Sequence, residues 1–399
     1  MKWEKVKLGN VTDSCLGKML DQNKNKGDYQ PYLANVNVRW GEFDLEDLPL
    51  MKFEESEQER YELKYGDLVI CEGGEPGRCA IWKEQIPNMK IQKALHRVRV
   101  HDCLDYRYLF YWFLLAGKTG ELDQYFTGAT IKHMPGQKLK EVVIDKPPLE
   151  IQHRIADILS AYDDLIENNQ KQIKLLEEAA QRLYKEWFVD LRFPGHENTK
   201  IVDGVPEGWN WCKLEDAIQL DPKVTLTKER MKQFIPMSAL STSSMVLDES
   251  QFTETTSNSG SKFQNGDTLL ARITPCLENG KTAYVSGLKS DEGAVGSTEY
   301  IVMRAKTINS YMVYLLARTD DFRQSAINSM SGSDGRQRVK SDKLKMLDYL
   351  HPTSELVEKF ENVEEPIFEK IYRLSKQMQQ AKQARDLLLP KLMSGEVEV

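Results

Sequence analysis

The stretch that decides the fold spans residues 147–188 and reads PPLEIQHRIADILSAYDDLIENNQKQIKLLEEAAQRLYKEWF. It predicts one helix of roughly 40 residues, about 60 Å long at 1.5 Å rise per residue. Apolar residues recur there at steps of three and four, which places them on one face that has to be buried. The members of this seam are Ile151, Ile155, Ile158, Tyr162, Ile166, Asn169, Ile173, Leu176, Ala180, Leu183 and Trp187.

A second seam begins 205 residues later and repeats every step of the first, including an irregular step after Tyr162. Any two coiled coils share a heptad pattern, but a shared irregularity at a fixed offset indicates a tandem duplication. Asn169 and Arg385 are the polar residues in the two seams. The second seam consists of Leu356, Phe360, Val363, Ile367, Ile371, Leu374, Met378, Ala381, Arg385, Leu388 and Leu392.

The segments outside the helices repeat in the same order. WEKVKL at 3–8 resembles WNWCKL at 209–214, and GDLVI at 66–70 resembles GDTLL at 266–270. Strands are predicted for LVICEGG, CAIW and ALHRVRV in the first half and for TLLARI, KTAYV and EYIVMR in the second. RYLFYWFLLAG and SYMVYLLAR are predicted as short helices whose aromatic residues pack in the core.

These patterns predict an α+β fold with two mixed α/β domains in tandem pseudo-twofold repeat, separated by two long helices packed as an antiparallel coiled coil. The domains would then lie at opposite ends of the helices. Because proline disrupts a helix interior, Pro366 predicts a break near Glu365, with a shorter helix over 352–364. The predicted segments are domain 1 at 1–146, a spacer helix at 147–192, a linker at 193–208, domain 2 at 209–351 and a second spacer helix at 352–399.

Composition narrows the classes of function. The net charge is −7, but residues 1–147 carry 22 Lys+Arg against 23 Asp+Glu, and residues 207–351 carry 18 of each. The surplus acid therefore lies in the helices, and binding to nucleic acid would depend on local basic clusters. No apolar run is long enough to span a bilayer, so we expect a cytoplasmic protein without membrane contact. The six scattered cysteines predict reduced thiols.

No catalytic or metal-binding motif is present in the sequence. Gly117-Lys118-Thr119 and Gly280-Lys281-Thr282 resemble the end of a P-loop, but Trp112 and Pro275 stand where its first glycine belongs. HExxH, CxxC and GxSxG are missing, and the histidines have no metal-ligand spacing. The sequence therefore favours a binding protein.

Over nearly its full length the chain resembles the specificity subunits of type I restriction-modification enzymes. The segments that carry the resemblance are PPLEIQHRIADILSAYDDLIENNQKQIKLLEEAAQRLYKEWFVDLRF at 147–193, VPEGWNWCKLEDA at 205–217, GDTLLARITPCLENGKTAYV at 266–285, GSTEYIVMR at 296–304, FTGATIKHMPGQKLKEVVI at 126–144 and LLLPKLMSGEVEV at 387–399.

The resemblance implies that each globular part is a target recognition domain, which reads one half of a bipartite site in double-stranded DNA. It implies that the helices set the gap between the halves. Two modification subunits, which bind S-adenosylmethionine and methylate adenine N6, are expected as partners, together with restriction subunits that use ATP and Mg. The specificity subunit itself is expected to hold no cofactor and to catalyse nothing.

Candidate DNA contacts follow from the chemistry of phosphates and base edges, which call for cations and for side chains that reach a groove. Basic loops follow matching glycines in the two halves, Gly128 and Gly332; a merely solvated loop is the alternative for each. The candidates there are Lys132, His133, Arg336, Arg338 and Lys340. Further candidates, for which a structural role is weighed equally, are Lys90, Gln92 and Lys93, Asn35, Asn37 and Arg39, and Arg272 and Asn279.

Two other classes of function compete with DNA recognition. A two-domain scaffold on a coiled-coil spacer, with no nucleic acid, would fit the acidic balance. A nucleotide-dependent enzyme is disfavoured by the broken P-loops. The contact between the helices is predicted to involve Ile155, Tyr162, Asn169, Leu176, Leu183, Trp187, Phe360, Ile367, Leu374 and Leu388.

Overall fold

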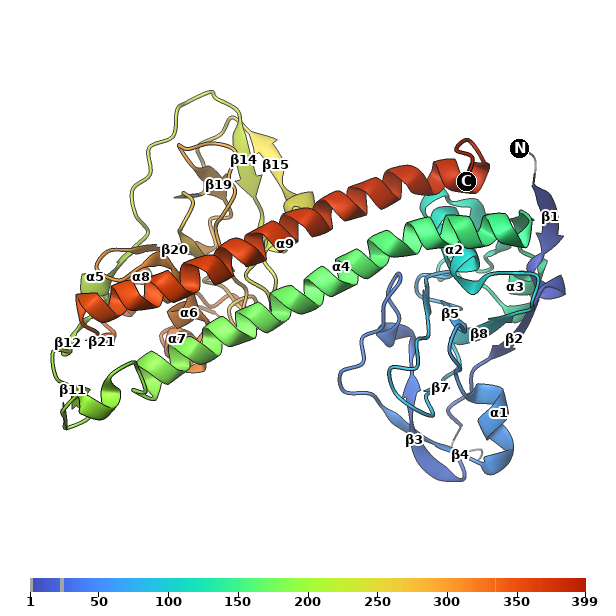
Figure 1. Ribbon diagram of the computed structural model, residues 1–399, viewed down its shortest axis with the longest axis horizontal. Coiled ribbons are helices and arrows are strands. Elements are labelled where there is room, and N and C mark those ends of the chain that lie inside the picture. The colour runs from blue at the N-terminus through green and yellow to red at the C-terminus, as the bar shows by residue number, and fades with distance from the viewer. Residues whose placement is uncertain (1–2, 22–24, 334) are drawn as a thin grey trace. The chain divides into compact units, whose positions relative to one another are not determined.

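The computed structural model describes residues 3–21, 25–333 and 335–399 (Figure 1). The chain forms two compact units. Unit 1 comprises Met1–Ile166 with Gln380–Val399, and unit 2 comprises Glu167–Gln379. Each unit therefore contains a globular part and one stretch of each long helix. The five-segment division predicted from the sequence stays a prediction.

The two long helices are α4 (Leu149–Tyr184), which continues in a π-helical turn at Lys185–Val189, and α9 (Ser354–Ser394). Within unit 2, Asn169 of α4 lies against Leu374 of α9, whereas Trp187 packs on Phe360 at 5.3 Å between ring centroids. Residues later in α4 thus meet residues earlier in α9, so the two stretches are antiparallel. The predicted fold class is confirmed.

Two details of the second seam are corrections. Helix α9 runs through Pro366 without the predicted break. Pro366 is exposed, so water can reach the carbonyl group that loses its helical donor, and the packing of buried Phe360 and Phe368 holds the helix together. The seam also passes through Glu364, which is fully buried, and not through Val363, which is 43% exposed.

The globular part of unit 1 contains two small sheets. The first has the order β2 (Thr12–Leu16), β8 (Leu95–Val100), β5 (Leu68–Cys71) and β6 (Cys79–Ile81), all antiparallel. The second places β3 (Asp28–Leu33) between antiparallel β4 (Leu50–Phe53) and parallel β7 (Lys90–Ile91). Strands β1 (Glu4–Lys7) and β9 (Val143–Lys146) form a separate pair beside α3 (Gly136–Glu141), and α1 spans Gln58–Tyr61.

Unit 2 repeats this topology. Its first sheet has the order β13 (Ile218–Leu220), β20 (Tyr300–Ala305), β17 (Thr268–Ala271) and β18 (Thr282–Tyr284). Its second sheet has the order β15 (Thr253–Thr255), β14 (Lys232–Ile235), β19 (Ala294–Gly296) and β16 (Ser261–Phe263), with β14 and β19 parallel. The pairs β12 (Asn210–Lys213) with β21 (Asp348–His351) and β10 (Ile201–Val202) with β11 (Val205–Pro206) complete the strands.

The same turn and ion pair occur in both first sheets. Asp67 accepts two hydrogen bonds from Arg99, each at 2.7 Å, and Asp267 accepts two from Arg304, each at 2.6 Å. Both aspartates follow the glycine of the repeated Gly-Asp motif and are 1% exposed. A bidentate pair at a buried turn fixes the start of the central strand. This role explains why the Gly-Asp motif is repeated in the two halves of the sequence.

One apolar helix lies between each first sheet and the long helices. These are α2 (Tyr106–Thr119), capped by Asp105, and α6 (Ser310–Arg318), capped by Asn309. Their aromatic side chains are buried, as predicted, and join the cores of their units. Unit 2 also contains α5 (Leu214–Ala217), α7 (Asp320–Asn328) and α8 (Ser341–Lys345). The predicted strands and short helices correspond to β5, β6, β8, β17, β18, β20, α2 and α6.

Candidate nucleic-acid interface

In unit 2, two loops that are distant in sequence meet at Arg338. Its backbone forms bridges with Ser331, across the base of the basic hairpin 331–338, and with Ile273, in the loop between β17 and β18. The next residue, Val339, donates its N–H to the carbonyl oxygen of Arg272 at 2.9 Å. The segment ARITPCLENGK and the basic hairpin therefore form one surface.

Unit 1 builds the same junction around His133. Its backbone forms bridges with Thr127 and with Gly73, and Met134 donates its N–H to the carbonyl oxygen of Glu72 at 2.7 Å. Each of these contacts has its counterpart in unit 2. His133 and Arg338 are therefore structurally equivalent, whereas the sequence predicted only that the loops after Gly128 and Gly332 match.

A third loop joins each junction. A 3-10 turn, Asn35–Asn37, receives a hydrogen bond from Arg78 to the Asn35 carbonyl oxygen at 3.2 Å. The matching turn, Met237–Ala239, receives one from Lys281 to the Met237 carbonyl oxygen at 3.0 Å. We call these assemblies the three-loop surfaces: residues 35–39, 72–78 and 127–133 in unit 1, and 237–239, 272–281, 331–333 and 335–338 in unit 2.

Most of the predicted cations are exposed. Lys132 lies 3.3 Å from Asp123 and over the Phe126 ring, but an exposed pair of this kind is weak and exchanges readily for another anion. Gln92 is half-buried, and its backbone forms a bridge with Lys18. The exposed candidates are Arg39, Lys93, Lys132, His133, Asn279, Arg336 and Lys340.

Two candidates are corrected by their burial. Lys90 is fully buried, and its ammonium group lies 2.6 Å from Glu62, so it presents no charge to a phosphate. Asn37 is 6% exposed; its amide accepts from the Ala34 N–H at 2.9 Å and donates to the Asp44 carbonyl oxygen at 3.1 Å. Both side chains stabilise the fold, because a buried polar group needs a partner.

Three further candidates hold the loops in position. Asn35 donates to the Gly73 carbonyl oxygen at 2.5 Å, and Arg272 donates to the Val339 carbonyl oxygen at 2.8 Å. Arg338 binds Glu299 at 2.7 Å and thereby holds the pKa of that carboxyl below its usual range. Their polar groups are at least partly occupied within the protein.

Two arginines that lie beside the loop 272–281 were not predicted from the sequence. Arg318, in the last turn of α6, donates to the Gly280 carbonyl oxygen at 2.9 Å. A Cβ atom at Gly280 would lie 2.9 Å from Nη1 of Arg323, which belongs to α7. These cations add to the positive charge around the three-loop surface of unit 2. Arg318 stands in the last turn of a predicted helix, but its position in the sequence does not show what that end approaches.

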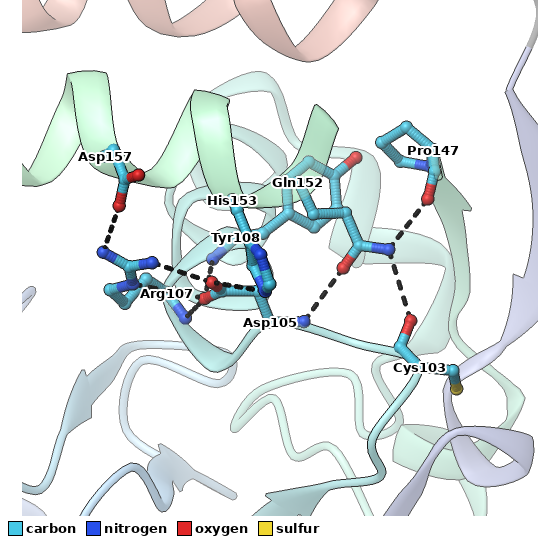
Figure 2. A network of polar contacts seen from close by, with 8 residues as sticks. All are labelled: Cys103, Asp105, Arg107, Tyr108, Pro147, Gln152, His153 and Asp157. Carbon is cyan, nitrogen blue, oxygen red and sulfur yellow. Dashed lines mark hydrogen bonds and ion pairs between the residues drawn. The ribbon is translucent and has the colours of Figure 1, made fainter. Parts of the chain in front are cut away.

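A polar network fastens the globular part of unit 1 to α4 (Figure 2). The fully buried Gln152 accepts from the Asp105 N–H at 2.9 Å and donates to the Pro147 carbonyl oxygen at 2.8 Å. Arg107 bridges Asp105 at 2.9 Å and Asp157 at 2.6 Å. The start of α2 and the first turns of α4 are thus tied together by directional bonds, which resist rotation of the globular part about α4.

In unit 2 the contacts between the globular part and the long helices have different chemistry. Glu177 of α4 accepts from the Ser244 hydroxyl and from the Met245 N–H, both at 2.7 Å. Burial raises the pKa of Glu177. Asn309 at the start of α6 donates to the Val357 carbonyl oxygen of α9 at 3.0 Å. Both long helices therefore hold the globular part of unit 2.

The predicted helix-contact residues all lie in the buried or half-buried faces of α4 and α9. Asn169 is 1% exposed and donates to Gln377 at 3.2 Å. Arg385, the polar residue of the second seam, donates to Asp163 at 2.5 Å. Each polar residue of a seam therefore has a partner on the other helix.

In the part of the chain that the structure describes, no group of three or more His, Cys, Asp or Glu side chains is placed to hold a metal ion. Among the same residues no helix is both long and apolar enough to cross a membrane.

Comparisons with known proteins agree with this architecture. Residues 1–178 match the family described as type I restriction modification DNA specificity domain. The chain is 29% identical over 344 residues to the type I restriction enzyme MjaIX specificity subunit of Methanocaldococcus jannaschii, covering 84% of this chain and 78% of that protein. It is 35% identical over 140 residues to the EcoAI specificity subunit of Escherichia coli, covering 34% of this chain and 24% of that protein.

The fold is shared with a solved structure of a type I restriction-modification system S subunit from M. genitalium. The TM-score is 0.60 at 16% identity, and the match covers 98% of this chain and 96% of that chain. The comparisons therefore show a match to the DNA specificity domain family in residues 1–178 and a fold shared with this S subunit over nearly the whole chain.

Proposed function

We propose that the chain recognises a bipartite DNA site, with one three-loop surface contacting each half and with α4 and α9 setting the gap between the halves. The observation that carries the proposal is the duplicated junction at His133 and Arg338. The backbone contacts are the same in both units, whereas the side chains on the loops differ. A duplicated frame with different loop chemistry is suited to reading two different short sequences.

We infer the partners from the likeness to type I specificity subunits. Two modification subunits would bind S-adenosylmethionine and methylate adenine N6, and restriction subunits would use ATP and Mg for translocation and cleavage. This chain would direct those activities in the cytoplasm without holding a cofactor or catalysing a step. The scaffold without nucleic acid is the alternative that the experiment below distinguishes.

The test is to co-express the chain with its modification subunit in cells that lack other adenine methylation and to map N6-methyladenine across their DNA. We expect one motif with two specified halves around a fixed run of unspecified bases. An assembled complex that methylates no such motif, and that shows no salt-dependent binding to DNA, would support the scaffold instead.

A further inference from the structure

The two three-loop surfaces differ in chemistry at one pair of matched positions. Ile131 and Arg336 each stand two residues before the residue that closes their hairpin, His133 and Arg338 respectively. The glycine near the start of each hairpin faces this position. A Cβ atom at Gly128 would lie 2.3 Å from the carbonyl oxygen of Ile131, and one at Gly332 would lie 3.1 Å from that of Arg336. The two positions are therefore equivalent.

The neighbouring 3-10 turns also differ in polarity, with an apolar residue in unit 1 and a polar residue in unit 2. Val36 occupies the centre of the turn in unit 1, and Ser238 occupies it in unit 2. Val36 is 68% exposed and Ile131 is 64% exposed, so unit 1 presents two large aliphatic side chains on its three-loop surface. Unit 2 presents a hydroxyl group and an exposed guanidinium group instead.

Ile131 also borders a hollow of about 540 Å³, whose lining includes Trp40, Phe126 and Lys132. Of the two carboxylates in this lining, Glu75 already has partners within the protein, because it accepts from Trp40 at 2.7 Å and from Arg78 at 2.9 Å. Asp123 forms only the exposed pair with Lys132. The rings of Trp40 and Phe126 make the surroundings of Ile131 suited to an apolar contact.

In the major groove, the apolar feature of a base edge is the C5-methyl group of thymine, and the usual partner of an arginine is the O6/N7 edge of guanine. We infer that the two units read chemically different half-sites, with Ile131 contacting a thymine methyl group and Arg336 contacting a guanine. This inference rests on the proposed function and adds to it the class of base feature that each unit reads.

The test uses the full chain in its complex with modification subunits and short duplexes that carry the mapped site. Each thymine is replaced in turn by uracil, which lacks only the methyl group, and each guanine by 7-deazaguanine, which lacks N7. One methyl group buried against Ile131 corresponds to about a four-fold change in affinity. We expect uracil at one position in one half-site to weaken binding by that factor.

The variant Ile131→Ala should bind the unmodified duplex about four-fold more weakly and should no longer distinguish thymine from uracil at that position. Ile131→Thr, which keeps a methyl group, should retain part of the discrimination. In the other half-site, 7-deazaguanine should weaken binding roughly ten-fold for the unaltered protein and have no effect on Arg336→Ala. Both residues are exposed, so the variants are expected to fold.

Uracil sensitivity that persists unchanged in Ile131→Ala would overturn the inference, as would equal binding of every uracil duplex by the unaltered protein. Either result leaves the proposed function intact, because the complex still binds and methylates its site. A complex that binds none of the duplexes would overturn both.

Discussion

Arg385 of α9 binds Asp163 of α4 at 2.5 Å within unit 1, and the Tyr111 hydroxyl of α2 donates to the other oxygen of the same carboxylate at 2.6 Å. The repeat offset of 205 residues places buried Phe368 and Ala180 at the matching positions of unit 2. Pairing either helix with a copy of itself would therefore leave Asp163 or Arg385 without its partner. The ion pair therefore favours the pairing of α4 with α9 over the pairing of either helix with a copy of itself.

Removing this pair should destabilise unit 1. Arg385→Leu leaves a half-buried carboxylate with only the tyrosine hydroxyl, and we expect the free energy of unfolding to fall by roughly 2 kcal/mol. Denaturant unfolding followed by circular dichroism measures the change. The control is Arg373→Leu, which breaks an exposed pair with Glu369 on the same helix and should cost less than about 0.5 kcal/mol. Equal losses in both variants would contradict a specific role for Arg385.

Asn169 should reduce stability while it fixes the register of the helices. Its hydrogen bonds to the Leu374 carbonyl oxygen and to Gln377 are long, 3.5 and 3.2 Å, in an otherwise apolar seam. Asn169→Leu introduces the residue that the repeat carries at position 374, and we expect a rise in melting temperature. A fall of more than about 1 kcal/mol in the free energy of unfolding would show that these hydrogen bonds stabilise the protein.

Glu364 makes the stability of unit 2 depend on pH. It is fully buried, and within the described residues neither carboxylate oxygen has a hydrogen-bond partner. Burial raises its pKa from 4.5 to about 7. The folded protein then holds a proton that the unfolded chain releases, so the free energy of unfolding should fall by about 3 kcal/mol as pH rises from about 4.5 to about 7, and stay low above that.

The variant Glu364→Leu tests this linkage, because buried Leu159 stands at the matching position of α4. We expect the variant to be more stable than the unaltered protein at pH 8 and to lose the decline between pH 4.5 and 7. Glu365→Gln, which alters an exposed neighbour, should leave the decline in place. A decline that survives Glu364→Leu would assign it to another group.

Exposed and buried lysines should affect DNA binding differently. Lys340→Ala is expected to weaken binding by the assembled complex and to reduce the slope of log affinity against log salt by about 1, because one phosphate contact is lost. Lys90→Ala should leave the slope unchanged and lower stability, since Glu62 loses its buried partner. Binding isotherms at several salt concentrations distinguish the two variants. A smaller slope for Lys90→Ala would contradict the assignment of Lys90 to the fold and not to DNA contact.

The sequence predicted those features that depend on periodicity and repetition. Two matched seams predict the long helices, and the offset predicts that the loops after Gly128 and Gly332 match; the equivalence of His133 and Arg338 comes from their backbone contacts. Glu364 and Pro366 were misjudged because single-residue preferences favour Val363 at the seam and a break at a proline. Tertiary packing overrides both preferences.

Which polar side chains are available to a ligand could not be predicted from the sequence alone. Lys90 and Asn37 are of residue types that often contact DNA. In this fold, however, each side chain makes a buried hydrogen bond, in the second sheet of unit 1 or in an adjoining turn. Ile131 and Val36 are not predicted as DNA contacts from the sequence, because apolar side chains are expected in the core of the protein. Only the fold shows which side of a short loop faces solvent.

The most direct test of the central claim lengthens both long helices at the boundary between the units. One heptad inserted after Ile166 in α4 and one after Gln379 in α9 keeps the seams in phase and leaves the contacts within each unit unchanged. The inserted segments add about 10 Å of helix. We predict a methylation motif with both specified halves unchanged and a longer run of unspecified bases between them. An unchanged gap, or altered half-sites, would contradict the claim that the helices set the spacing.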